Sequence, residues 1–189
     1  MYNILLDRLP TEYEGYLIRP SFRIGMQICL CLQDSEFDDS EKLAVVLNLL
    51  YGNGMPELKT AVEGLKWFMQ CGIQNTNSHN DPKTLFYWDF DAQRIFSSFQ
   101  ATYDIDLTKE DMHWFKFIAM LGSLNKDSAF SKAVEIRAYD MKDLKGKAKQ
   151  DMMKLKHELT PVIEYSEEEK EQMAKFDKLL QGGGEDVNA

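Results

Sequence analysis

The chain has few cysteines, and they are not arranged as a zinc site. Its 189 residues include three, Cys29, Cys31 and Cys71. A zinc site needs a second cysteine pair or suitably spaced histidines, and neither accompanies Cys29 and Cys31. On a helix, residues two positions apart point about 200° away from each other. We therefore expect three small core or boundary residues in a reducing compartment, and a fold that needs neither a disulfide nor a metal.

Signatures of nucleotide and hydrolase chemistry are also absent. The patterns GxxxxGKS/T, GxGxxG, GxSxG and HExxH do not occur. The glycine run Gly182–Gly184 predicts a flexible terminus rather than a phosphate-binding loop. No apolar run approaches the roughly 20 residues that a helix needs to cross a bilayer, and the first residues do not have the pattern of a secretory signal. We expect no enzyme activity, no cofactor, no membrane span and a cytoplasmic location.

Positive charge is scarce, which bears on the choice of partner. The 22 Lys and Arg residues are outnumbered by 31 Asp and Glu residues, and the net charge is -9 at pH 7. An acidic surface repels the phosphate backbone, so nucleic acid is not the expected partner. The lysine-rich stretch at residues 142–156 is interspersed with acidic residues, as on a solvated helix.

The first 32 residues predict a small β-hairpin followed by a helix. Asn3–Leu6 and Tyr16–Ile18 have the composition of strands, and a loop with Pro10 and Gly15 joins them. Residues 22–32 are ambiguous, because their apolar residues alternate as in a strand and also recur at helical spacing. Strands usually contain about five or six residues, so the length of this run favours a helix.

Helices are easier to predict from residue 40 onward. Residues 40–51 carry one apolar stripe that ends at Gly52, and a second stripe follows Pro56 and ends at Gly72. A polar loop then leads to residues 86–124, which concentrate many of the aromatic side chains. Apolar spacing predicts two helices there, the first capped by Asp91 and the second by Thr108.

The second of these helices is apolar on nearly all sides, which is typical of a buried helix. We expect it to form the centre of an all-α domain of five or six main helices with a minor N-terminal β-hairpin. The predicted structural core residues are Phe99, Trp114, Phe115 and Ile118.

A change in composition divides the chain into three parts. Residues 1–140 form the predicted helical core domain, residues 141–181 a charged helical appendage that extends the fold, and residues 182–189 a disordered C-terminus. Ser166 and Glu169 have the spacing of a capping box. On the helix that they open, one face carries Met173, Phe176 and Leu180. This face is the predicted partner-binding site, with folding back onto the chain's own domain as an equal alternative.

Two groups of polar residues invite a catalytic or metal-binding interpretation. His113 lies beside Asp111 and Glu110, but neighbours one or two apart on a helix do not face each other. The preferred interpretation is a structural role, in which the ring makes a hydrogen bond to a backbone carbonyl or to an adjacent element. Acidic residues gather around the aromatic helices without the spacing of a calcium-binding loop. We interpret them as helix caps and as first-turn acids that complement the helix dipoles. We predict no catalytic and no metal-binding residues. The acidic residues are Asp89, Asp91, Asp104, Asp106, Glu110 and Asp111.

Several stretches of the sequence resemble one family of tailed-bacteriophage proteins. They are LLDRLP at Leu5–Pro10, SEKLAVVLNLLY at Ser40–Tyr51, LKWFMQCG at Leu65–Gly72, YDIDLTKEDMHWFKFIAMLGSL at Tyr103–Leu124 and VEIRAYD at Val134–Asp140. The family comprises tail assembly chaperones encoded just upstream of the tape-measure gene in siphophages of Gram-positive hosts. The resemblance covers residues 1–140 and is most specific around His113 and Trp114.

The resemblance implies a function in protein–protein contact. Such a chaperone binds the tape-measure protein, a companion tail chaperone or both in the host cell cytoplasm, can self-associate, and is absent from the mature particle. In many such phages the chaperone has a short form and a frameshifted long form, and the sequence does not show which one this is. The alternative is a structural tail or connector component that stays in the virion.

Overall fold

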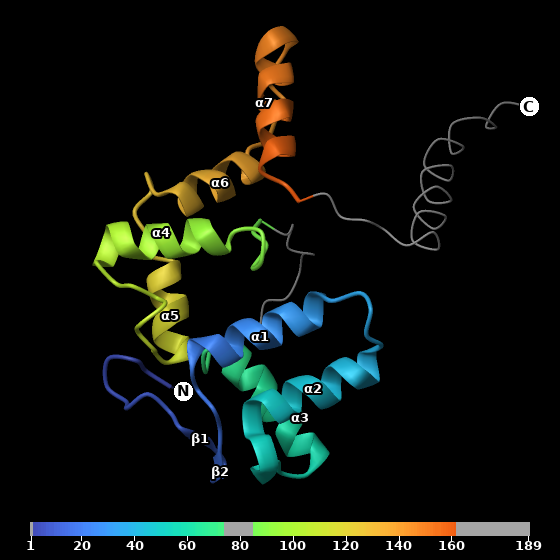
Figure 1. Cartoon of the computed structure of the whole chain (residues 1–189), viewed down its shortest axis with the longest axis vertical. Coiled ribbons are helices and arrows are strands. Elements are labelled where there is room, and N and C mark those ends of the chain that lie inside the picture. The colour runs from blue at the N-terminus through green and yellow to red at the C-terminus, as the bar shows by residue number, and fades with distance from the viewer. Residues whose placement is uncertain (1, 74–84, 162–189) are drawn as a thin grey trace, which may run out of the picture.

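The computed structural model describes residues 2–73 and 85–161 (Figure 1). Within these residues the fold is all-α with one minor N-terminal β-hairpin, as the sequence predicts. The elements are β1 (Glu12–Tyr13), β2 (Tyr16–Leu17), α1 (Phe22–Gln33), α2 (Asp39–Tyr51), the short 3-10 helix η1 (Gly52–Gly54), α3 (Leu58–Met69), α4 (Ala92–Tyr103), α5 (Trp114–Leu121), α6 (Ala129–Ala138) and α7 (Gly146–Glu158).

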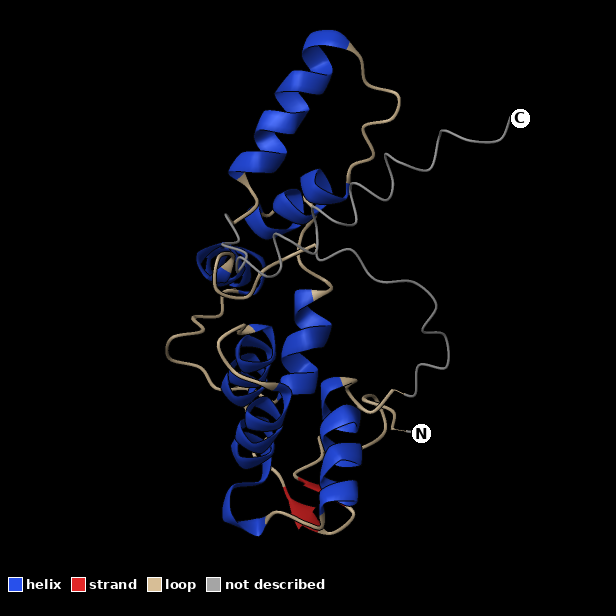
Figure 2. Ribbon diagram, turned by 90° about the vertical axis from the view of Figure 1, so that its right-hand side faces the viewer, coloured by secondary structure: helices blue, strands red, loops and turns tan. Residues whose placement is uncertain are grey.

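Helices α1, α2 and α3 form one end of the molecule together with the β-hairpin, while α4 and α6 lie side by side towards the other end (Figures 1 and 2). Helix α5 runs between these two groups. Helix α7 projects from the end formed by α4 and α6 and buries none of its residues. The position of α5 makes it the central helix of the fold.

The ambiguous run at residues 22–32 is a helix, α1. The Ser21 side chain accepts a hydrogen bond from the Arg23 N–H at 3.2 Å, which satisfies one of the free amides of the first turn. Part of the strand-like alternation arises because α1 is covered on more than one side, whereas Leu30 and Leu32 near its end are exposed. Helix α1 packs against α2 and α5, so apolar residues occupy more than a single helical stripe.

The prediction that Asn3–Leu6 forms the first strand of the hairpin is wrong. Its backbone instead makes a tight turn, in which the Leu6 and Asp7 N–H groups both donate to the Asn3 carbonyl oxygen, at 3.0 and 2.8 Å. The hairpin is shorter, and β1 pairs with β2 across a two-residue turn. Glu14 and Gly15 have φ values of 49° and 83° in that turn, as a type I′ hairpin requires.

The prediction that Thr108 caps the second aromatic helix is also wrong. Asp106 accepts hydrogen bonds from the Thr108 N–H at 2.9 Å and from its hydroxyl at 2.6 Å, which holds a separate turn. Helix α5 begins only at Trp114, and its N-cap is His113. A short aspartate side chain competes for nearby amides, so the turn forms in place of another helical turn.

Both ring nitrogens of His113 make hydrogen bonds, and one of them caps α5. Nδ1 accepts from the Phe115 N–H at 3.0 Å, so the ring is neutral and its proton is on Nε2, which donates to the Pro10 carbonyl oxygen at 2.8 Å. Burial lowers the pKa of His113, and the hydrogen bond to Pro10 opposes part of that shift. The histidine therefore fastens the N-terminal segment to α5, the structural role expected for it.

The core is a cluster of aromatic rings around α5. Trp114 is 2% exposed, and its ring centroid lies 5.8 Å from that of Phe117 and 5.9 Å from that of Trp88. Phe99 and Phe115 are also buried, whereas Ile118 is half-buried at the edge of the cluster. Three of the four predicted core residues thus lie inside, and the fourth lies where the core meets the surface.

A buried ion pair joins α6 to the start of α4. The Arg137 guanidinium makes two hydrogen bonds to the Asp91 carboxylate, at 2.6 and 2.8 Å, and Asp91 is fully buried. Burial alone would raise the pKa of Asp91, but hydrogen bonds from Arg137 and Tyr87 and the charge of Arg94 outweigh it and lower the pKa. Asp91 occupies the predicted N-cap position, yet its carboxylate binds these partners rather than the helix amides.

Candidate protein-binding groove

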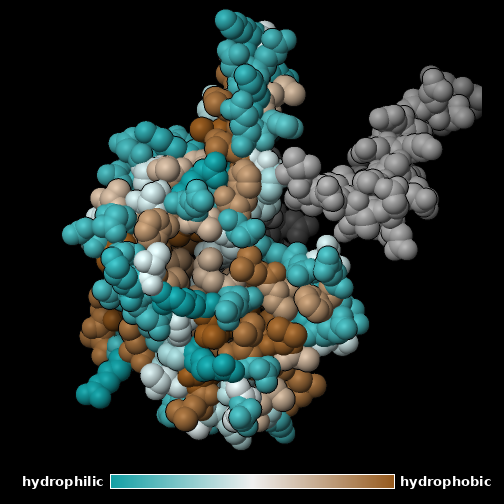
Figure 3. All heavy atoms as spheres, in the orientation of Figure 1, coloured by the Kyte–Doolittle hydropathy of each residue, from teal (hydrophilic) through white to brown (hydrophobic). Residues whose placement is uncertain are grey.

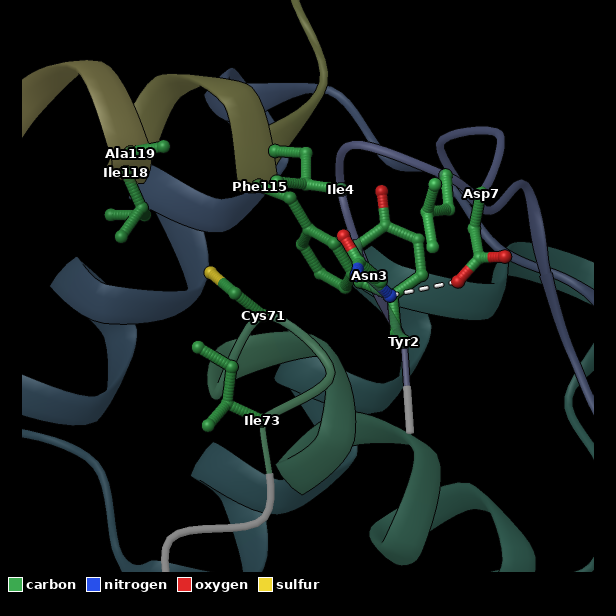
Figure 4. Close-up of a pocket in the computed structure, with 10 residues that line it drawn as sticks. Tyr2, Asn3, Ile4, Asp7, Cys71, Ile73, Phe115, Ile118 and Ala119 are labelled. Atoms are coloured by element: carbon green, nitrogen blue, oxygen red, sulfur yellow. Dashed lines mark hydrogen bonds between the residues drawn. The ribbon is translucent and has the colours of Figure 1, made fainter.

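An apolar groove lies between the N-terminal segment, the end of α3 and one face of α5 (Figure 4). Its volume is about 700 Å³. The lining residues are Tyr2, Asn3, Ile4, Leu6, Asp7, Cys71, Ile73, Phe115, Ile118 and Ala119. We call this feature the N-terminal groove.

The turn at Asn3 forms one wall of the N-terminal groove. Besides the backbone bonds of the turn, the Asn3 N–H donates to the Asp7 carboxylate at 2.7 Å, and the Asn3 side chain accepts from the Leu5 N–H at 3.0 Å. Because the turn satisfies its own polar groups, it holds Leu5 and Leu6 at the surface without a strand partner. Leu5 is 89% exposed and Leu6 is 83% exposed.

The end of α3 forms the opposite wall. Cys71 and Gly72 have φ values of 53° and 73°, and the Gly72 N–H donates to the Trp67 carbonyl oxygen at 2.9 Å, which closes the helix and reverses the chain. Cβ of Tyr2 lies 3.0 Å from where a Cβ on Gly72 would be placed. A glycine there lets the N-terminal segment approach, and the reversal presents Ile73 to the groove.

Helix α5 supplies the floor. Phe115 is buried and meets the Tyr2 ring edge to face, with centroids 5.3 Å apart. Ile118 and Ala119 lie one turn further along α5, and Figure 4 shows them on the same side of the groove as Phe115. The aliphatic residues are half-buried or exposed, so they are open to a second apolar surface.

Burial disfavours the charged, nucleophilic forms of two side chains in the groove, the Cys71 thiol and the Tyr2 phenol. Burial raises the pKa of the Cys71 thiol to about 11, so the thiol is protonated at neutral pH. Burial also raises the pKa of Tyr2, and the nearby Asp7 charge adds to that shift. A protonated thiol and a protonated phenol beside an aliphatic surface suit binding through burial of apolar area.

The interpretation of the acidic residues around the aromatic helices as helix caps and first-turn acids is wrong: neither α4 nor α5 has an acidic residue in its first turn, and neither is capped by a carboxylate. Three of these residues make other contacts instead. Asp91 pairs with Arg137, Asp106 holds the Thr108 turn, and Asp111 lies 3.1 Å from Arg23 and accepts from the Ser21 hydroxyl at 2.6 Å. Across residues 2–73 and 85–161, no three His, Cys, Asp or Glu side chains gather in a way that would hold a metal ion. In the same residues, no helix is long and apolar enough to span a membrane.

The sequence-predicted partner-binding residues, Met173, Phe176 and Leu180, lie outside the described residues. The sequence does not predict the N-terminal groove, because the interpretation of Asn3–Leu6 as a strand leaves no exposed turn there. A signal was present, since Ile4, Leu5 and Leu6 are consecutive apolar residues, whereas a half-buried strand alternates apolar and polar residues.

The fold and the groove together define a small all-α protein with an apolar surface open to a partner. Comparison with protein families identifies it further: the model of the Bacteriophage Gp15 protein family matches residues 5–161, which is more than half of the chain. The chain therefore belongs to this bacteriophage protein family. Searches of curated proteins and of solved structures found no match.

Proposed function

We propose that this phage protein is a tail assembly chaperone that binds the tape-measure protein of its phage during tail morphogenesis. The observation that carries the proposal is the pair Leu5 and Leu6, almost fully exposed beside the apolar N-terminal groove. Leaving such side chains in water is unfavourable, and contiguous exposed apolar surface marks sites of protein contact.

The shape of the groove supports an amphipathic helix as the bound element. A helix of the partner can bury apolar residues at spacings of three and four against Ile73, Ile118 and Ala119, while Leu5 and Leu6 cover its outer side. Burying a leucine side chain contributes roughly 1.5–3 kcal/mol. Several such residues are enough for a reversible complex, which suits a chaperone that must later release its client.

The charge of the chain supports a solubilising role. A net charge of -9 makes complexes with an apolar client repel one another, which opposes aggregation. We propose that the protein acts in the host cell cytoplasm, has no enzymatic activity, and leaves before the particle is complete. A companion tail chaperone is a second proposed partner. Self-association through a head-to-tail contact would generate an open array around the client.

Co-expression tests the proposal. The protein carries an affinity tag, and the tape-measure protein of the same phage is expressed without one. We expect the tape-measure protein to become soluble and to elute in constant ratio with the tagged chain. A tape-measure protein that stays insoluble and unbound would contradict direct binding.

Mass spectrometry of purified particles separates the proposal from the alternative of a structural tail or connector component. We expect the protein to be absent from the finished virion or present far below the level of the tail subunits. Retention in stoichiometric amounts would favour the structural component instead.

A further inference from the structure

A second apolar groove lies at the C-terminal end of α1, apart from the N-terminal groove. It has a volume of about 620 Å³, and we call it the α1 groove. The lining residues are Leu30, Gln33 and Asp34 of α1 and its cap, Tyr87, Trp88, Asp89 and Phe90 before α4, and Pro161. Figure 3 shows hydrophobic residues gathered over α1 in the middle of the visible face.

The α1 groove combines a firm floor with exposed apolar walls. Trp88 is buried and packs against Trp114 and Phe117 of the core, so the floor is fixed. Leu30 and Phe90 are 39% and 38% exposed, which leaves apolar surface free to contact another element. These are the properties of a docking site for an amphipathic helix.

The position of Pro161 indicates which helix docks there, because the described chain ends in the wall of this groove. The preceding residues are held in place: the Leu159 carbonyl oxygen accepts from Arg137 Nε at 2.6 Å, and the Thr160 hydroxyl donates to the Lys156 carbonyl oxygen at 2.7 Å. Residues 162–189 therefore start from a fixed point beside Leu30 and Phe90.

The sequence after Pro161 has a suitable apolar face within reach. Ser166 and Glu169 have capping-box spacing, which predicts the start of a helix, and Met173, Phe176 and Leu180 would fall on one side of such a helix. The four residues 162–165 span at most about 14 Å, and seven helical residues from Ser166 to Met173 add about 10 Å. The apolar face thus begins within about 25 Å of the groove wall.

We propose that residues 166–181 form a helix that docks Met173, Phe176 and Leu180 into the α1 groove of the same molecule. A short connection gives such a segment an effective concentration in the millimolar range, so even a weak contact is well populated. The proposal goes beyond the chaperone function, because it assigns an occupant to a groove that the proposed client does not use.

Hydrogen exchange of the full-length chain, followed by mass spectrometry of its peptides, tests this docking. Phe176→Asp places a charge on the apolar face, and Ala174→Asp adds the same charge about 160° away from Phe176 on the helix. We expect Phe176→Asp to accelerate exchange about tenfold in peptides covering residues 85–91 and 170–181, as expected for a contact populated about nine parts in ten. Ala174→Asp should leave both regions close to wild type.

A substitution in the groove tests the same contact from the other side. Leu30→Asp is expected to accelerate exchange at residues 170–181 to the same extent, while circular dichroism shows an unchanged helical content. Equal exchange in the wild type, Phe176→Asp and Ala174→Asp would overturn the proposal. Protection that disappears on hundredfold dilution would also overturn it, because the segment would then be docking on a second molecule.

Discussion

Gly25 of α1 lies directly against the face of the Trp114 indole in α5. A Cβ atom built on Gly25 would lie 2.2 Å from Cε3 and 2.4 Å from Cδ2 of Trp114, far inside van der Waals contact. The absence of a side chain at Gly25 therefore permits the close approach of α1 to the central helix. Trp114, one of two buried tryptophans in the described part of the chain, thus packs against a residue that has no side chain.

Gly25→Ala is expected to destabilise the protein although alanine is the better helix former. The added methyl group must displace the indole, and overpacking of this kind costs about 1–3 kcal/mol. Chemical denaturation measures the loss. Gly54→Ala is the matched control, because a Cβ there meets nothing within 4 Å, and we expect a change within about 0.5 kcal/mol. Equal losses of stability for the two substitutions would contradict the close contact between Trp114 and Gly25.

Trp114→Ala should be among the most damaging single substitutions. It removes a buried ring from the centre of the aromatic cluster, and the cavity left behind costs about 3–5 kcal/mol. Leu58→Ala, at a residue that is 60% exposed, provides the comparison and should cost less than about 1 kcal/mol. A loss under about 1 kcal/mol for Trp114→Ala would place this side chain at the surface.

Arg137→Met tests the buried ion pair. It leaves the Asp91 carboxylate buried without its main partner, and breaking such a pair from one side costs about 3–5 kcal/mol. Lys132→Met breaks the exposed pair of Lys132 with Asp127, at 3.4 Å, and should cost under about 1 kcal/mol. Denaturant titrations of both variants give the comparison. If the two losses are similar, the Asp91–Arg137 pair is not buried as described.

The stability of the protein should depend on the protonation of His113. The pKa of His113 is lowered in the folded state, so the unfolded chain binds the proton more readily. The contribution of neutral His113 to the free energy of unfolding is therefore fully present above pH 6.5, the ordinary pKa value. That contribution is lost as the pH falls through the range between 6.5 and the lower folded value, since a protonated Nδ1 cannot accept from Phe115.

His113→Asn isolates this contribution, because asparagine also caps a helix but does not titrate. We expect the stability advantage of the wild type over His113→Asn to shrink between pH 7 and pH 5 in denaturant titrations. A difference that stays constant over that range would contradict a lowered pKa of His113 in the folded state.

Local patterns were sufficient to predict most helices of this chain. The apolar stripes of α2, α3 and α4 repeat at helical spacing, and Gly52 with φ at 60° ends α2 where the sequence indicated. Features that depend on distant residues were not predictable in this way. The Asp91 carboxylate binds Arg137, 46 positions away, and His113 binds the Pro10 carbonyl, 103 positions away.

The N-terminal groove also depends on residues that are distant in the sequence, so local patterns do not predict it. Its walls come from Tyr2, Cys71 and Phe115, which have no relation in the sequence and meet only because α3 reverses at Gly72. The consecutive apolar residues Ile4–Leu6 lack the alternation of a half-buried strand, but this pattern alone does not identify a turn. The hydrogen bonds of Asn3 and Asp7 favour the turn, and only the folded arrangement shows that its leucines remain uncovered.

The most direct measurement of the central claim is the amount of soluble tape-measure protein recovered with three tagged forms of the chain. They are the wild type, the double variant Leu5→Asp/Leu6→Asp, and Leu58→Asp, which alters an exposed leucine at the far end of α3. We expect recovery with the wild type and with Leu58→Asp, and at least a tenfold loss with the double variant, whose fold should be intact. Undiminished recovery with the double variant would contradict binding through the N-terminal groove.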